Sequence, residues 1–112
     1  MHHAYDYLAA CYADPLTIAS IAQVACLSPF HFQRLFKARF GATPMQALRE
    51  QRLQRARALL ADGATTVQDA ALAVGYSSPA SFTHLYRRRF GRVPSAECDR
   101  AVLNKRRATR LA

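Results

Sequence analysis

The side chains of this sequence that could take part in chemistry recur in two similar segments, at residues 28–41 and 78–91. Each segment starts with Ser-Pro, carries aromatic residues at matching positions and ends with Phe-Gly, while the polar residues in between differ from one copy to the other. This pattern is typical of one helical scaffold that occurs twice, with the same buried residues but different surface residues in each copy. The differing polar and basic residues are suited to hydrogen bonding with base edges and phosphates.

The outward positions of the two segments supply the candidates for contact with bases. Arg34 can form two hydrogen bonds with guanine, and Gln33 can form two with adenine. Phe30 can contact a thymine methyl, whereas His84 offers a single polar contact and is equally well explained as an ordinary surface histidine. The candidate base-contacting residues are Phe30, Gln33, Arg34, Ala80, Ser81, Thr83 and His84.

Basic residues follow these positions in both segments, where contact with the DNA backbone is the better interpretation. We expect Arg92 to add to this set, and the acids Glu97 and Asp99 to repel DNA locally. Since Arg34 and Gln33 can each form two bonds to one base, we expect the first segment to determine sequence preference more than the second. The candidate phosphate-contacting residues are Lys37, Arg39, Arg87, Arg88 and Arg89.

The charge of the chain favours a nucleic-acid partner. Its formal net charge is +9, Arg far outnumbers Lys, and no Lys or Arg precedes Arg34. Arg binds phosphate and guanine edges with two parallel donors, which Lys cannot do. We therefore favour nucleic acid over a merely solvated basic surface. Duplex DNA is preferred to RNA because the aromatic residues have the spacing of a core rather than of stacking platforms.

The composition also bounds the class of protein. Apolar residues make up 51% of the 112 residues, so the chain can bury a core. No apolar run approaches the ~20 residues of a membrane span, and no signal-peptide pattern opens the chain, so we expect no membrane contact and a cytoplasmic, nucleoid-associated protein. The cysteines lack the short spacing of a zinc site, which indicates reduced thiols and no metal. There is no glycine-rich phosphate loop and no catalytic Cys/His pair, so we expect no enzyme activity and no cofactor.

About seven helices and no strand are expected to position these residues, because apolar residues recur at helical spacing and nowhere alternate over a useful length. Ser and Thr before Pro mark helix starts, and Gly41 and Gly91 suit left-handed helix ends. The longest helix has an apolar arc that includes Met45 and Leu59. The expected helices cover residues 4–13, 18–25, 29–40, 44–61, 67–73 and 79–90, and a short one begins at Pro94.

Two pairs of these helices have the features of a helix-turn-helix. Ala22 and Ala71 allow the first helix of each pair to approach the second closely, and Gly75 suits the turn between them. Cys26 occupies the matching turn position of the first pair and is a less suitable residue. The second helix of each pair has an apolar stripe that we interpret as core. These stripes are Phe32, Leu35, Phe36 and Phe40, and Phe82, Leu85, Tyr86 and Phe90.

The chain is therefore expected to be all-α, with two helix-turn-helix lobes joined by a long central helix. The first lobe covers about residues 4–43, the linker helix about 44–61 and the second lobe about 62–103, so that the DNA-binding domain spans residues 1–103. Residues 104–112 form a basic tail without an apolar face, which we expect to be frayed.

The two motifs together resemble the DNA-binding domain of the AraC/XylS family of bacterial transcription regulators. The resemblance rests on residues 27–37, on Arg52-Leu53 and the apolar residues that follow, and on residues 74–94. It implies recognition helices that enter successive major-groove segments of one DNA face, often with bending, and a sequence-specific transcription regulator. Three departures stand out. Ala47 stands where relatives commonly have an aromatic residue, and residues 95–100 lack the usual Tyr-Arg ending. Ala80 and His84 make the second recognition helix less rich in arginine at its base-facing positions than the first.

Two other functions remain open. A helical protein-interaction module would explain the amphipathic helices but not the Arg residues on both copies, and a non-specific nucleic-acid binder would explain the charge alone. Many members of this family carry a ligand-binding or dimerisation domain before the region of resemblance, and the basic tail leads us to expect a stand-alone regulator rather than a fragment of a longer one. We expect a monomeric chain with double-stranded DNA and RNA polymerase as partners.

Overall fold

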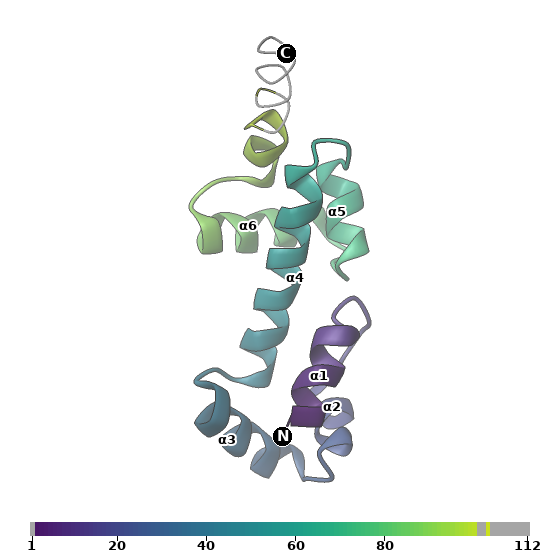
Figure 1. Ribbon diagram of the computed structural model, residues 1–112, viewed down its shortest axis with the longest axis vertical. Helices are drawn as coiled ribbons and strands as arrows, with labels where there is room; N and C mark the ends of the chain where they lie inside the picture. Colours follow the sequence, from purple (N-terminus) through teal and green to yellow (C-terminus); the bar gives the residue numbers. More distant parts are fainter. Residues whose placement is uncertain (1, 101–102, 104–112) are drawn as a thin grey trace. The chain divides into compact units, whose positions relative to one another are not determined.

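The computed structural model describes residues 2–100 and 103, and the regular elements within these residues are α-helices (Figure 1). They are α1 (His2–Ala10), α2 (Ile18–Val24), α3 (Pro29–Phe40), α4 (Pro44–Ala61), α5 (Val67–Ala73) and α6 (Pro79–Phe90). Residues 94–100 are helical as well, so the predicted seventh helix is present, and the all-α prediction is confirmed. In the described part of the chain no helix is long and apolar enough to cross a membrane. The predicted basic tail lies outside the described residues.

The helix boundaries follow from capping residues. The side chains of Ser28, Thr43 and Ser78 each accept a hydrogen bond from the backbone amide three residues later, at 3.2–3.3 Å. A proline follows each of them at the first helical position, where no backbone donor is needed. Gly41 and Gly91 end α3 and α6 in the left-handed conformation, with φ of 77° and 78°. Because these signals are local, the bounds of α3, α4 and α6 agree with the prediction to the residue.

The described helices divide into two compact units, and the division falls within α4: the first unit ends at Arg52 and the second begins at Leu53. In the first unit, α2 packs against both α1 and α3. Phe36 lies at the centre of an aromatic row, 5.5 Å from Phe32 and 4.6 Å from Phe40 between ring centroids. The buried residues of this core are Ala4, Leu8, Ile21, Ala22, Phe32, Phe36 and Leu48.

The second unit repeats this arrangement, with α5 packed against α6. Tyr86 takes the place of Phe36, and its ring lies 5.7 Å from that of Phe82 and 4.6 Å from that of Phe90. Helix α4 contributes buried residues to both units. In the second unit the buried hydrophobic residues are Leu53, Ala56, Leu60, Ala70, Ala71, Val74, Phe82 and Tyr86.

The predicted core was too wide at its edges. Leu35 is 47% exposed although it belongs to the predicted stripe of α3. A helix turns by about 100° per residue, so Leu35 lies about 80° away from the direction midway between Phe32 and Phe36. Met45 and Leu59 of α4 are exposed as well. Their prediction assumed that α4 faces one core, whereas the two units bury different positions along it.

Helix α1 differs most from its prediction. It starts at His2 rather than at residue 4, and it ends at Ala10 rather than at residue 13. Beyond its end, Arg52 donates hydrogen bonds to the carbonyl oxygens of Tyr12 at 2.6 Å and Asp14 at 2.9 Å. These bonds hold the chain in a turn after the helix. Local sequence signals do not reveal them because Arg52 is distant along the chain.

Both helix-turn-helix motifs are present. Ala22 on α2 and Ala71 on α5 are buried, as close helix packing requires. The turn after α2 places Cys26 in the left-handed region with φ of 58°, and the turn after α5 places Gly75 there with φ of 98°. Cys26 and Gly75 are therefore equivalent, as predicted. A residue with a side chain adopts this conformation at a cost of about 1–2 kcal/mol, which glycine avoids.

Candidate nucleic-acid interface

Helix α3 presents its predicted base-contacting residues on the side opposite its core. Phe32 and Phe36 are buried, whereas Phe30, Gln33 and Arg34 are exposed, Phe30 to 70%. The Arg34 guanidinium carbon lies 5.8 Å from the centre of the Phe30 ring, which is within cation–π range. The two residues are four positions apart, so they are neighbours on the helix surface. The contact places a guanidinium beside an aromatic surface on one exposed face.

Helix α6 presents a less uniform set. Of its four predicted base-contacting residues, Thr83 is partly buried and the other three are exposed. His84 lines an open depression together with Arg87 and Arg88. The structure therefore brings one predicted base-contacting residue next to two predicted phosphate-contacting residues. Thr83 is less accessible than its sequence position indicates.

The predicted phosphate-contacting residues lie in the last turns of α3 and α6 and are exposed. Cationic side chains also stabilise a helix C-terminus, so the helices themselves explain part of their presence. Two of them have partners within the chain. The Arg39 Nη2 atom lies 3.1 Å from His2 Nε2, and the Arg89 guanidinium carbon lies 4.9 Å from the centre of the Phe90 ring. These contacts restrain the side chains of Arg39 and Arg89.

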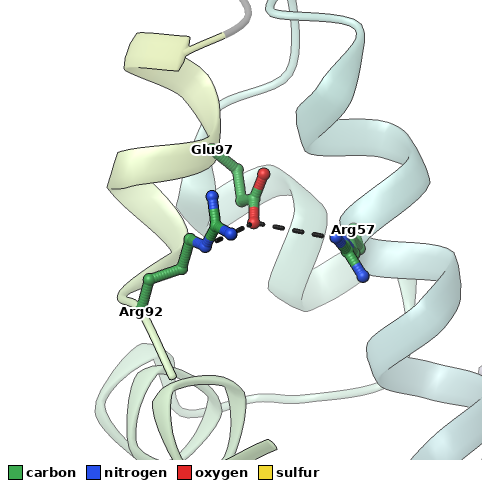
Figure 2. Close-up of polar contacts among 3 residues, drawn as sticks. All are labelled: Arg57, Arg92 and Glu97. Carbon is green, nitrogen blue, oxygen red and sulfur yellow. Dashed lines mark ion pairs between the residues drawn. The ribbon is translucent and has the colours of Figure 1, made fainter. Parts of the chain in front are cut away.

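A buried acidic residue pairs with part of the positive charge of the second unit (Figure 2). Glu97, on helix 94–100, is buried. Its Oε1 atom lies 3.6 Å from Nε of Arg92 and 4.0 Å from Nε of Arg57 on α4. The sequence alone suggests that Arg92 contacts the DNA backbone and that Glu97 repels DNA. In the structure the two side chains are paired with each other.

Tyr86 lies in the same environment. Burial, and after it the Glu97 carboxylate, raise the pKa of the Tyr86 hydroxyl above its usual range. The hydroxyl and Glu97 Oε1 are both buried, and among the described residues neither has a hydrogen-bond partner. One sequence signal could have revealed the position of Glu97. It follows Pro94 by three residues in a helix that begins there, so the two share a face, and both are buried.

The remaining titratable groups can be considered as metal ligands and as reactive thiols. Residues 2–100 and 103 contain no group of three His, Cys, Asp or Glu side chains that could hold a metal ion. Cys11, Cys26 and Cys98 are free thiols. Burial raises the pKa of Cys98, whose Sγ lies 3.6 Å from the carbonyl oxygen of Thr65. The exposed faces of α3 and α6 offer hydrogen bonding, positive charge and an aromatic surface.

Comparison with known proteins identifies the family. A family model described as a helix-turn-helix domain matches residues 21–100 of the chain. The chain belongs to the AraC family of helix-turn-helix DNA-binding domains. It is 37% identical over 82 residues to the HTH-type transcriptional regulator GlxA of Rhizobium meliloti, a match that covers 73% of this chain and 25% of that regulator. The chain spans about a quarter to a third of the length of this and two further curated relatives.

Solved structures share the fold of this AraC-family domain. A probable AraC family transcriptional regulator from Rhodopseudomonas palustris has a TM-score of 0.81 and 35% identity, and the match covers 89% of this chain and 94% of that one. The DNA-binding domain of AdpA, solved in complex with a target DNA, has a TM-score of 0.85 and 26% identity, with 96% and 95% covered. The predicted family and the fold with two helix-turn-helix motifs are confirmed.

Proposed function

We propose that this AraC-family domain binds double-stranded DNA sequence-specifically in bacterial transcription regulation, with α3 and α6 in successive major-groove segments. The observation that carries the proposal is the duplicated motif, in which matching aromatic positions are buried alike while the exposed faces differ. A repeated scaffold with different exposed polar residues suits the reading of two different base sequences. The AdpA domain, which has a similar fold and was solved with a target DNA, supports it.

In this proposal α3 supplies most of the sequence preference. Arg34 donates two hydrogen bonds to a guanine, and the Phe30 ring beside it contacts the methyl group of a thymine. The ring, 5.8 Å from the guanidinium carbon, already restrains Arg34, so less side-chain freedom is lost when DNA binds. Gln33 on the same exposed face reads an adenine.

Helix α6 supplies affinity more than sequence preference. Ala80 has only a methyl group to offer, and Thr83 is partly buried. Ser81 and His84 are limited to single polar contacts with bases. The arginines beside His84 bind phosphates at the edge of the groove. Lys37, Arg39, Arg87, Arg88 and Arg89 together hold the two helices on the DNA backbone.

Selection of binding sites from random duplexes tests this assignment. We expect one sharply defined half-site and a weaker one about one helical turn away, a spacing of ~34 Å. The selection repeated with Arg34→Ala is expected to blur the sharp half only. Arg49→Ala is the matched control, because it removes the same charge from an exposed position on α4. Two equally defined halves would contradict the unequal roles, and a chain that binds no duplex would favour a protein-interaction module instead.

The proposal also covers the organisation of the chain. It includes a DNA-binding domain over residues 1–103 with lobes at about 4–43 and 62–103, a monomeric state, a cytoplasmic, nucleoid-associated location and contact with RNA polymerase. Sedimentation with a selected duplex is expected to show one chain per site. Co-purification of RNA polymerase with the chain on that duplex, but not on a scrambled one, tests the protein partner.

A further inference from the structure

Glu97 lies between two arginines of the second unit, and the three residues come from different segments (Figure 2). Arg57 is on α4, Arg92 lies between α6 and helix 94–100, and Glu97 is on that helix. The side chain of Glu97 is 8% exposed, whereas those of Arg57 and Arg92 are 46% and 40% exposed. The Glu97 carboxylate is therefore buried, whereas the side chains of Arg57 and Arg92 reach the protein surface.

Arg57 has a second neighbour in the same unit. Its guanidinium carbon lies 4.9 Å from the centre of the Phe90 ring, at the end of α6. Arg57 is thus held by the Glu97 carboxylate and by an aromatic face. Both interactions would weaken if the guanidinium turned towards a ligand outside the protein.

Whether Arg57 and Arg92 remain paired with Glu97 depends on the free energy of these ion pairs compared with that of contacts to DNA phosphates. A buried carboxylate that loses its cationic partners is strongly unfavourable, because nothing replaces the water that it gave up on folding. A phosphate contact at the surface is screened by solvent and salt and gains less. The physical argument therefore favours retention of Arg57 and Arg92 by Glu97 when DNA is near.

We propose that Glu97 holds Arg57 and Arg92 back from the DNA backbone and so limits sequence-independent DNA binding by the second unit. The inference rests on the proposed DNA-binding function. Glu97 is a positioning residue, since it contacts no DNA and determines which arginines of the second unit add to its affinity. Arg87 and Arg88, which line the depression with His84, provide the phosphate contacts.

Glu97→Gln keeps the shape of the side chain and removes its charge. When one arginine then reaches a phosphate, the plot of log association constant against log salt for a random duplex steepens by about 0.9. If the affinities of variant and wild type converge at about 1 M salt, this means about 15-fold tighter binding at about 50 mM salt and about fourfold at about 200 mM. Asp99→Asn is the matched control, because it makes the same charge change at an exposed position of the same helix. It is expected to leave the slope nearly unchanged.

Two results with this pair would overturn the inference. Equal effects of Glu97→Gln and Asp99→Asn would show that net charge alone matters. A shallower slope for Glu97→Gln would show that Glu97 directs its arginines towards phosphates. Circular dichroism at the temperature of the binding experiment confirms that each variant is folded. A merely structural role of Glu97 would lower affinity and would not steepen the slope.

Arg92→Ala tests the inference with the charge of Glu97 left in place. We expect it to leave the random-duplex slope unchanged, whereas Arg88→Ala is expected to make the slope shallower by about 0.9. If Arg92→Ala and Arg88→Ala made the salt slope shallower by the same amount, the inference would be overturned. This comparison does not depend on whether Glu97→Gln folds. A wild-type chain that binds no duplex would instead overturn the proposed function, so the two failures are distinguishable.

Discussion

The position of Arg34 on the exposed face of α3 leads to a quantitative prediction about sequence reading. Arg34→Ala removes a bidentate contact with guanine, which contributes about 1–3 kcal/mol of discrimination. The affinity for a selected duplex is therefore expected to fall about 5- to 150-fold. The affinity for a random duplex is expected to change much less, because Arg34 is assigned to a base and not to the backbone.

The energy of the contact between Arg34 and Phe30 can be measured separately. An exposed cation–π contact contributes about 0.5–1 kcal/mol, and the distance of 5.8 Å lies near its outer limit of ~6 Å. We expect the lower value. In a double-mutant cycle of Phe30→Ala and Arg34→Ala, the coupling in the free energy of unfolding, measured with urea, is therefore about 0.5 kcal/mol.

Fluorescence anisotropy with a labelled duplex measures the effect of Arg34→Ala on DNA binding. Each base pair of the selected site is changed in turn, and Arg34→Ala is expected to lose its preference at one guanine only. Equal losses of affinity for the selected and random duplexes would refute the assignment of Arg34 to a base. Arg49→Ala, with the same loss of charge on α4, is expected to keep the preference at every position.

Three further predictions concern stability. Cys26→Gly is expected to stabilise the first unit by about 0.5–1 kcal/mol in urea unfolding, since Cys26 is exposed and has φ of 58°; a loss of stability would show that the thiol packs usefully. Arg52→Ala is expected to destabilise the chain by about 1–3 kcal/mol, because the bonds to the carbonyl oxygens of Tyr12 and Asp14 are lost. Its salt slope for random duplex should stay unchanged, and a shallower slope would place Arg52 on DNA. Since burial raises the pKa of Tyr86, stability is expected to hold up to about pH 10 and to fall above it, as the unfolded chain ionises first. Urea unfolding of Tyr86→Phe should show a smaller fall, and an identical one would contradict this origin.

The elements that could be predicted best are those whose limits depend on neighbouring residues. Helices α3, α4 and α6 begin with Ser-Pro or Thr-Pro, and α3 and α6 end with Phe-Gly, so capping marks both ends of α3 and α6 and the start of α4. Helix α1 has no such marks. The turn after its end is held by Arg52, which belongs to another helix, and a pairing of that kind is absent from local propensity.

The candidate site could be predicted to the level of a helix face. The helical period places Phe30 and Arg34 opposite the core, and the structure agrees. The period does not show how deep a residue at the edge of a face lies, so Leu35 and Thr83 differ from expectation. The ion pair between Glu97 and Arg57 could not be predicted either, since Arg57 is forty residues earlier in the chain.

Helix α4 belongs to both units, since the division falls between Arg52 and Leu53 and buried residues lie on either side of it. Starting a helix is the unfavourable step in its formation, and extending it is much easier. Whichever unit folds first therefore provides the other with a helix that is already nucleated. For α4 that barrier is passed once for the two units. The continuous backbone of α4 therefore links the unfolding of one unit to that of the other.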